Sequence, residues 1–149
     1  SIFFASFCFA SNLSFMIKDD ESTESYLKIK NINDSVYLKL SCNNFINKID
    51  VKIIGVNQSN FMAKNIFSSK VVFGTSSSKE NWKIKYDDEG KIELYLEKEG
   101  FDFVRNLYKN SNILLDMKEL ESIKMFEIKN KDYLKNKLDM VFENCGIYF

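Results

Sequence analysis

The stretch that decides the fold is Trp82–Leu96, WKIKYDDEGKIELYL, in which apolar and polar residues alternate on both sides of a short acidic turn. Alternation with a period of two predicts β-strands with one buried face. Gly90 at the end of the turn accepts the positive φ that closes a three-residue hairpin loop. We therefore predict an antiparallel hairpin. Its register pairs Ile84 with Leu94 on the apolar face and Lys85 with Glu93, two opposite charges, on the outer face.

Strand patterns extend from this hairpin in both directions. Gly55 breaks the alternation that precedes it and predicts a bulge or the end of a strand. The polar segments 57–65 and 74–81 are predicted to be surface loops. In residues 123–129 the apolar side chains point to both faces, so the buried face of that strand is ambiguous. The segments with strand patterns are 13–18, 25–30, 36–42 and 49–53 before the hairpin, and 112–117 and 123–129 after it.

Two segments in the C-terminal third have helical periodicity instead. Residues 100–110 carry one apolar stripe through Phe101, Val104, Leu107 and Tyr108. Residues 130–146 carry a stronger one through Leu134, Leu138, Val141, Phe142 and Cys145. Asn130 or Asp132 can cap the start of this second helix, and Gly146 can end it. The pattern as a whole predicts an α+β fold, with a mostly antiparallel curled sheet or β-sandwich and two helices in the C-terminal third.

The first ten residues, SIFFASFCFA, form a short apolar run with small residues near its end. A membrane-spanning helix needs about 20 apolar residues, so the run is too short to cross a bilayer. It fits the apolar region and cleavage site of a secretory signal peptide, with the cut between Ala10 and Ser11. We therefore expect residues 1–10 to be a signal-peptide remnant, residues 11–149 to form one domain, and the protein to be periplasmic or secreted.

Two alternatives exist for this N-terminal run. It can instead form a first strand buried in the core. Cys8 can also be considered as a lipidated residue, but Phe7 precedes it where a lipid-attachment signal has a small residue. Ordinary cleavage is therefore favoured over lipidation.

The charge balance and the absence of histidine exclude several classes of function. Lysine plus arginine and aspartate plus glutamate both number 21, so no basic excess exists to neutralise phosphates, and we expect no nucleic-acid partner. The chain has no histidine, which removes Ser-His-Asp and Cys-His catalysis and histidine-ligated zinc. We therefore expect a non-enzymatic protein with no catalytic residues, no metal site and no cofactor. No later segment is apolar for long enough to span a membrane.

Whether the cysteines form a disulfide depends on the cellular compartment of the protein. If Cys8 leaves with the signal peptide, Cys42 and Cys145 remain as an even pair in an oxidising environment. Each lies on the apolar face of its predicted element, so both can point into one core. We predict a structural disulfide between them. The alternative is two independent buried thiols in a cytosolic protein.

Two clusters of carboxylates are the only candidates in the sequence for a catalytic or metal-binding role. Asp19-Asp20-Glu21 and Asp87-Asp88-Glu89 lack the spacing of a calcium loop or of a glycosidase pair, and both fall where polar turns belong. They are predicted to be solvated turns. Trp82 and Tyr86 can line a groove, but on an alternating strand they are more often core residues. Arg105, the only arginine, can be a buried ion-pair partner, a specific contact or a surface charge, and the pattern leaves these open.

A set of short motifs follows in a fixed order along the chain: Leu38, Leu40 and Cys42 in an L-x-L-x-C strand, Trp82 in the hairpin, Phe103, Val104 and Leu107 in the first helix, and Phe126, Ile128, Cys145 and Gly146 in the tail. From about residue 15 to residue 147, this order resembles the TagO/VasI-like periplasmic proteins associated with type VI secretion. The chain departs from that pattern at residues 71–76, VVFGTS, where an arginine and an aspartate are expected. It departs again at Ile147-Tyr148, where a tryptophan is usual.

The resemblance implies a non-catalytic accessory or assembly factor of a type VI secretion-like machine, with protein partners in the cell envelope. Two other functions agree with the same features. One is a periplasmic inhibitor or immunity protein that blocks an enzyme. The other is a carrier of a small apolar ligand, for which the aromatic content of 15% is sufficient.

Overall fold

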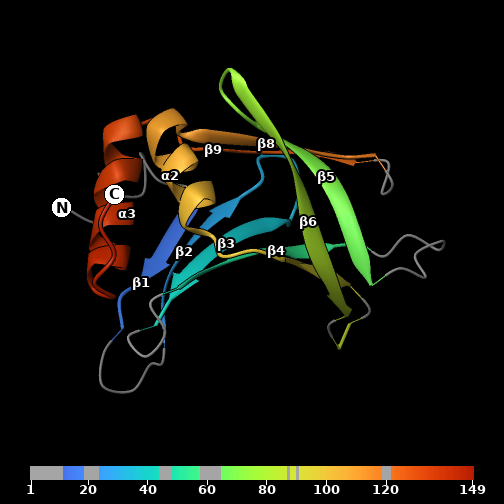
Figure 1. Cartoon of the computed structure of the whole chain (residues 1–149), viewed down its shortest axis with the longest axis horizontal. Coiled ribbons are helices and arrows are strands. Elements are labelled where there is room, and N and C mark those ends of the chain that lie inside the picture. Colours follow the sequence, from blue (N-terminus) through green and yellow to red (C-terminus); the bar gives the residue numbers. More distant parts are fainter. Residues whose placement is uncertain are drawn as a thin grey trace.

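The computed structural model describes residues 12–18, 24–43, 48–57, 65–86, 88–89, 91–118 and 122–149. Nine strands form one sheet, and two helices follow late in the chain (Figure 1). The predicted signal segment lies outside the described residues, as does the possible N-terminal strand there. The strands are β1 (Leu13–Met16), β2 (Ser25–Lys30), β3 (Tyr37–Cys42), β4 (Ile49–Val56), β5 (Ile66–Phe73), β6 (Ser76–Tyr86), β7 (Ile92–Leu96), β8 (Asn112–Met117) and β9 (Ser122–Glu127), and the helices are α2 (Phe101–Asn110) and α3 (Lys131–Glu143).

The strand order across the sheet is β1-β2-β3-β4-β7-β6-β5-β8-β9, and every neighbouring pair is antiparallel. Figure 1 shows the sheet curled into a half-barrel, with both helices at one side. The predicted α+β class with a curled antiparallel sheet is therefore confirmed. The predicted hairpin is also present as β6 and β7, with Ile84 opposite Leu94 and Lys85 opposite Glu93.

Gly55 produces one of the irregularities that curl the sheet. The pairing of β4 with β7 shifts between Ile53 and Val56, as expected for a bulge. Gly55 has a φ of +89°, and a Cβ atom there would lie 2.6 Å from the carbonyl oxygen of Ser35. Only glycine satisfies both the backbone conformation and the close approach. The predicted bulge is confirmed.

Side-chain amides bridge the two ends of the curled sheet. The amide of Asn12, just before β1, donates to the carbonyl oxygen of Glu127 in β9 at 2.7 Å. The amide of Asn31, just after β2, donates to the carbonyl oxygen of Met125 at 3.0 Å. An ion pair between Lys124 and Asp34 lies nearby. These contacts satisfy carbonyl groups that an edge strand leaves without a ladder partner.

Helix α3 packs against β1, β2 and β3, and α2 packs against α3, β5 and β8. Asn130 rather than Asp132 caps α3, because its Oδ1 accepts the backbone N–H of Tyr133 at 3.0 Å. The predicted stripe of α2 needs correction. Phe101 and Tyr108 are only half-buried, whereas Phe103 is buried and meets Phe73 and Trp82 edge to face.

The loop predicted at residues 74–81 is wrong beyond Thr75. Ser76–Asn81 form the first half of β6 and pair with β5. This segment has no apolar alternation of its own. It is a strand because the adjacent β5 buries Phe67, Val71 and Phe73, and backbone pairing extends the ladder outward from that core. Of the other predicted loop, the structure describes only Asn57 and Asn65.

The structure shows which face of residues 123–129 is buried in the curled sheet. Phe126 and Ile128 are buried, whereas Ile123 and Met125 lie on the exposed side of β9. The hairpin face is also less uniform than predicted. Trp82 is buried, but Ile84 is half-buried and Tyr86 is exposed, whereas their ladder partners Leu94 and Ile92 are fully buried.

Candidate functional site

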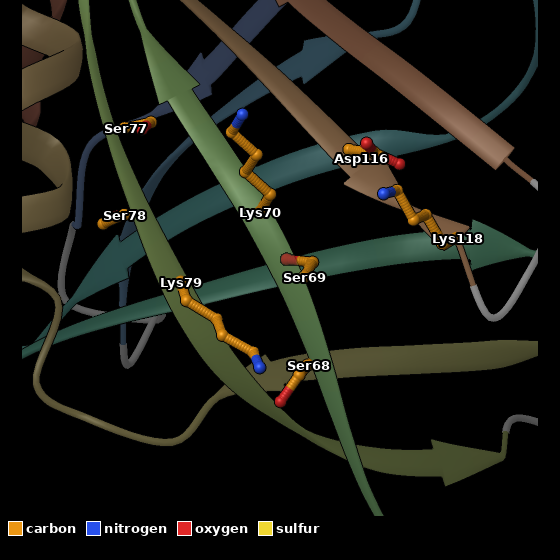
Figure 2. Close-up of a pocket in the computed structure, with 8 residues that line it drawn as sticks. All are labelled: Ser68, Ser69, Lys70, Ser77, Ser78, Lys79, Asp116 and Lys118. Carbon is orange, nitrogen blue, oxygen red and sulfur yellow. The ribbon is translucent and has the colours of Figure 1, made fainter.

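A polar groove lies over β5, β6 and the end of β8, with a volume of about 550 Å³ (Figure 2). We call it the lysine–serine groove. It combines three ammonium groups with four hydroxyl groups and one carboxylate. The residues that line it are Ser68, Ser69, Lys70, Ser77, Ser78, Lys79, Asp116 and Lys118.

The register of the sheet brings the charges of this groove together. Lys70 in β5 lies directly opposite Lys79 in β6 and directly opposite Asp116 in β8. Opposite charges across a ladder stabilise it and like charges destabilise it, so Lys70 has one favourable and one unfavourable neighbour. All three lysines are exposed. The groove is therefore a concentration of positive charge open to solvent.

Three of the four hydroxyl groups make hydrogen bonds within the sheet. Ser68 donates to Oδ1 of Asn81 at 2.7 Å. Ser69 is 3% exposed and accepts the indole N–H of Trp82 at 2.7 Å. Ser78 donates to Glu80 at 3.0 Å, and the same carboxylate pairs with Lys98 at 3.1 Å. These contacts fix the floor of the groove below its lysines.

The arrangement suits binding of an anionic group better than nucleophilic catalysis. A lysine that acts as a general base is normally desolvated, so that its neutral form is accessible at neutral pH. Lys70, Lys79 and Lys118 are instead solvated. Their ammonium groups provide charge and hydrogen-bond donors for a carboxylate or phosphate.

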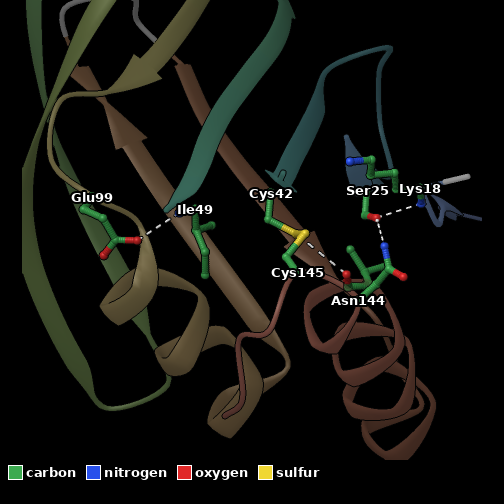
Figure 3. Close-up of a disulfide and its surroundings, with 8 residues drawn as sticks. Lys18, Ser25, Cys42, Ile49, Glu99, Asn144 and Cys145 are labelled. Atoms are coloured by element: carbon green, nitrogen blue, oxygen red, sulfur yellow. Dashed lines mark hydrogen bonds between the residues drawn. A yellow bond between two sulfur atoms is a disulfide. The ribbon is translucent and has the colours of Figure 1, made fainter. Parts of the chain in front are cut away.

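The structure joins Cys42 to Cys145 by a disulfide, which is the pairing predicted from the sequence (Figure 3). Their Cα atoms are 6.2 Å apart and 103 positions separate them in the chain. Cys42 ends β3 and Cys145 follows α3, and both side chains are buried. The disulfide therefore fixes the C-terminal helix to β3, the third strand from one edge of the sheet.

Polar contacts on both sides of the disulfide support the same junction (Figure 3). The hydroxyl oxygen of Ser25, which is fully buried, accepts the backbone N–H of Lys18 at 2.7 Å and the amide of Asn144 at 3.0 Å. The carboxylate of Glu99 accepts the backbone N–H groups of Ile49 and Phe101, each at 3.0 Å. The contacts of Ser25 and the Glu99–Ile49 contact were not predicted from the sequence, because their partners lie in separate segments of the chain. The Glu99–Phe101 contact spans only two positions and was missed although it is local.

The other residues that the sequence singled out do not gather at one site within the described part of the chain. Trp82 is 1% exposed and belongs to the core, whereas Tyr86 is 51% exposed at the hairpin tip. Arg105 is exposed on α2, and Asp88 is exposed in the turn. Residues 1–11, which include Cys8, lie outside the described residues, as do residues 19–23, Asp87 and Gly90.

Metal-binding clusters and membrane-spanning helices are both absent from the described residues. No set of three or more acidic or cysteine side chains is placed there to hold a metal ion. No helix there is both long enough and apolar enough to cross a bilayer. No protein-family model, curated protein or solved structure matches the chain.

The lysine–serine groove was not predicted from the sequence, because the prediction placed residues 74–81 in a loop. The available signal was the polar pattern of IFSSKVVF, residues 66–73, followed by SSSKEN, residues 76–81. Read as two antiparallel strands around Gly74-Thr75, these segments put Lys70 opposite Lys79. The contribution of β8 depends on a pairing distant in the chain and had no local signal.

Proposed function

We propose that this protein is a non-catalytic binding protein of an oxidising compartment of the cell envelope, and that it contacts its partner through the outer surface of the sheet. The observation that carries the proposal is the Cys42–Cys145 disulfide. Structural disulfides persist mainly in secreted and periplasmic proteins. The apolar run at residues 2–10 supports the same location.

The filled interior of the curled sheet supports binding at the outside. Trp82, Phe67, Phe126 and Phe142 are each at most 1% exposed, and they occupy the space between the sheet and the helices. A carrier of an apolar ligand usually keeps a cavity of about 300 Å³ or more in such a position. The groove of about 550 Å³ lies instead on the outer side of β5, β6 and β8 and is lined with lysine and serine.

The finer proposal is an accessory or assembly factor of a type VI secretion-like machine. It is supported by the ordered resemblance to TagO/VasI-like proteins, which includes the L-x-L-x-C strand and the C-terminal Cys145-Gly146. On this proposal the partners are envelope components of the machine. Deletion of the gene should then reduce secretion and leave the survival of sister cells unchanged.

Photo-crosslinking in the native envelope tests the proposal. A crosslinking residue is placed at Ser77, exposed at the groove, and in a matched variant at Met140, exposed on α3. We expect Ser77 to capture envelope proteins and Met140 to capture none of the same proteins. Equal capture from both positions, or from neither, would contradict the proposed surface.

Crosslinking together with three further observations separates the alternative functions. Capture of a single hydrolase at equal stoichiometry, with deletion lethal beside that hydrolase, would replace the proposal with an inhibitor or immunity protein. Release of a small molecule when the purified protein is denatured would replace it with a carrier. An intact N-terminus with two free thiols in the native host would contradict the proposed compartment.

A further inference from the structure

A row of lysines crosses the outer face of neighbouring strands, away from the lysine–serine groove. Lys28 in β2 lies directly opposite Lys39 in β3, and Lys39 lies directly opposite Lys52 in β4. Lys52 in turn lies opposite Tyr95 in β7. Together with Tyr26 and Tyr37 on the same face, these residues form what we call the lysine–tyrosine face.

This row of lysines destabilises the sheet. Like charges directly opposite each other on a ladder are destabilising, and here two such pairs follow in succession. The alternating pattern of β2, β3 and β4 requires only polar residues at these positions, and serine or threonine would satisfy it. A local arrangement that costs stability without helping the fold is most often found at functional surfaces.

Tyrosine rings hold the ammonium groups in place. Lys28 lies 5.4 Å from the ring centre of Tyr26, and Lys39 lies 4.8 Å from the same ring. Lys52 lies 4.8 Å from the ring centre of Tyr95. Such cation–π contacts orient the charges and leave them positive.

Only one of the three ammonium groups forms an ion pair with a carboxylate of the described residues. Lys39 pairs with Glu24 at 2.6 Å. Lys28 and Lys52 have no carboxylate of the described residues within ion-pair distance. Two of the three ammonium groups on the lysine–tyrosine face therefore form no ion pair with that part of the chain.

The spacing of the row favours an acidic helix over other anionic partners. Opposed residues on antiparallel strands have Cα atoms about 4.5–5.5 Å apart. Residues at i and i+4 on a helix have Cβ atoms about 5–6 Å apart. A helix lying across β2, β3 and β4 thus places successive i, i+4 carboxylates above Lys28, Lys39 and Lys52.

Two other polyanions fit this face less well. Single-stranded nucleic acid binds by stacking its bases on open aromatic rings, but lysines lie over the rings of Tyr26 and Tyr95. An anionic membrane is usually bound with exposed apolar side chains beside the cations. None of the exposed large apolar residues in the described part of the chain belongs to β2, β3, β4 or β7.

We propose that the lysine–tyrosine face docks an acidic helix of a protein partner, through carboxylates that repeat at i and i+4. The proposal rests on the proposed function only in taking the partner to be a protein. The proposed binding surface is the lysine–tyrosine face and not the lysine–serine groove, so mutations can test the two surfaces separately.

A synthetic helical peptide with glutamate at every fourth position tests this proposal, with binding followed by fluorescence anisotropy. The test variant is Lys28→Glu/Lys52→Glu. The control variant is Lys129→Glu/Lys131→Glu, which makes the same change in net charge at exposed positions beside and in α3. We expect the test variant to weaken binding at least tenfold and the control variant to weaken it less than twofold. Equal weakening by both variants would overturn the proposal.

Three further ligands test whether binding is specific for an acidic helix. A peptide of the same composition with its glutamates clustered should bind at least tenfold more weakly than the regular peptide, and equal binding would contradict helical recognition. Tighter binding of an oligouridine would assign the face to nucleic acid, and tighter binding of phosphatidylglycerol vesicles would assign it to a membrane. If the glutamate variant fails to fold, Lys28→Gln/Lys52→Gln replaces it, with an expected loss of at least threefold.

Crosslinking from Ser77 in the native envelope distinguishes failure of this proposal from failure of the proposed function. If Ser77 captures envelope proteins but the peptide does not bind, the lysine–tyrosine proposal is wrong and the proposed function stands. If the peptide binds as expected but Ser77 captures nothing, the acidic-helix site stands and the proposed function is wrong.

Discussion

Gly100 lies directly against Ile49. The backbone N–H of Gly100 donates to the carbonyl oxygen of Ile49 at 3.0 Å, and a Cβ atom on Gly100 would lie 2.9 Å from that oxygen and 2.7 Å from Cγ2 of Val51. This contact places the start of α2 against β4. We predict that Gly100→Ala lowers the free energy of unfolding by about 2 kcal/mol through overpacking, measured by urea denaturation.

The matched control for this variant is Gly146→Ala. Gly146 has a φ of +74°, and its added Cβ atom would meet nothing within 4 Å, so only backbone strain is introduced. We expect a loss of about 1 kcal/mol there. A smaller loss at Gly100 than at Gly146 would show that the α2–β4 contact relaxes freely.

The N-cap of α3 provides a second prediction. Because Oδ1 of Asn130 accepts the backbone N–H of Tyr133, Asn130→Ala should lower the free energy of unfolding by about 1 kcal/mol. Asn130→Asp keeps the acceptor and should cost much less. Faster hydrogen exchange at the first turn of α3 in the alanine variant alone would locate the effect, and equal exchange in both variants would contradict it.

The amide bridge between the sheet ends provides a third prediction. Asn31 is 4% exposed, and its side chain donates to Met125 and accepts the backbone N–H of Asn33. Asn31→Ala removes both of these partly buried hydrogen bonds, so we expect a loss of about 2 kcal/mol and faster exchange of β9 amides. Asn33→Ala keeps its backbone N–H and should change neither quantity. Unchanged β9 exchange in Asn31→Ala would exclude the bridge.

Reduction of the disulfide provides a fourth prediction. A closed loop of this length should stabilise the protein by about 4–5 kcal/mol in the chain-entropy model. We therefore expect reductant to lower the urea midpoint of the wild type, and to leave that of Cys42→Ser/Cys145→Ser unchanged. Intact-mass analysis after alkylation should show two additional labelled thiols only after reduction. Labelling of both before reduction would contradict the bond.

The pH dependence of Tyr95 provides a fifth prediction. Burial, the hydrogen bond to Glu93 and the charges of Glu93 and Asp50 raise the pKa of Tyr95 from 10.0 to about 12. Between these two values the unfolded chain binds fewer protons at this position than the folded chain, so the free energy of unfolding falls as pH rises. The contribution is present in full below pH 10 and lost as pH rises through about 12.

Comparison with Tyr95→Phe isolates the contribution of Tyr95 from those of all other groups. We expect the phenolate absorbance of the wild type to contain one late step that the variant lacks. We also expect the wild type to lose stability more steeply than the variant above pH 10. Parallel stability curves would contradict the raised pKa.

Local signals predicted the parts of the fold that depend on neighbouring residues. The β6–β7 register followed from the alternation around residues 87–90, and the cap of α3 followed from Asn130 or Asp132 at the start of an apolar stripe. The disulfide was also predictable, because both cysteines lie on apolar faces. These features need little information from the rest of the chain.

The candidate surfaces could not be predicted in the same way. Asp116 joins the lysine–serine groove only because β8 pairs with β5, and Tyr95 joins the lysine–tyrosine face only because β7 pairs with β4. Neither pairing has a turn signal, since the strands are not consecutive. The prediction for Ser76–Asn81 failed for a related reason: their strand conformation depends on the partner strand and not on their own apolar pattern.

The strand order also has a consequence for how the chain folds. Strands β1 to β4 are hairpin neighbours in sequence, and so are β5 to β7 and β8 to β9. Each group can form from local contacts, and only the β4–β7 and β5–β8 seams join distant segments. Distant pairing slows folding because the intervening loop must first be closed. During synthesis β4 therefore remains an edge strand until Ile92–Leu96 has emerged, and β5 remains one until Asn112–Met117 has followed. Completion of the sheet depends on closure of both seams.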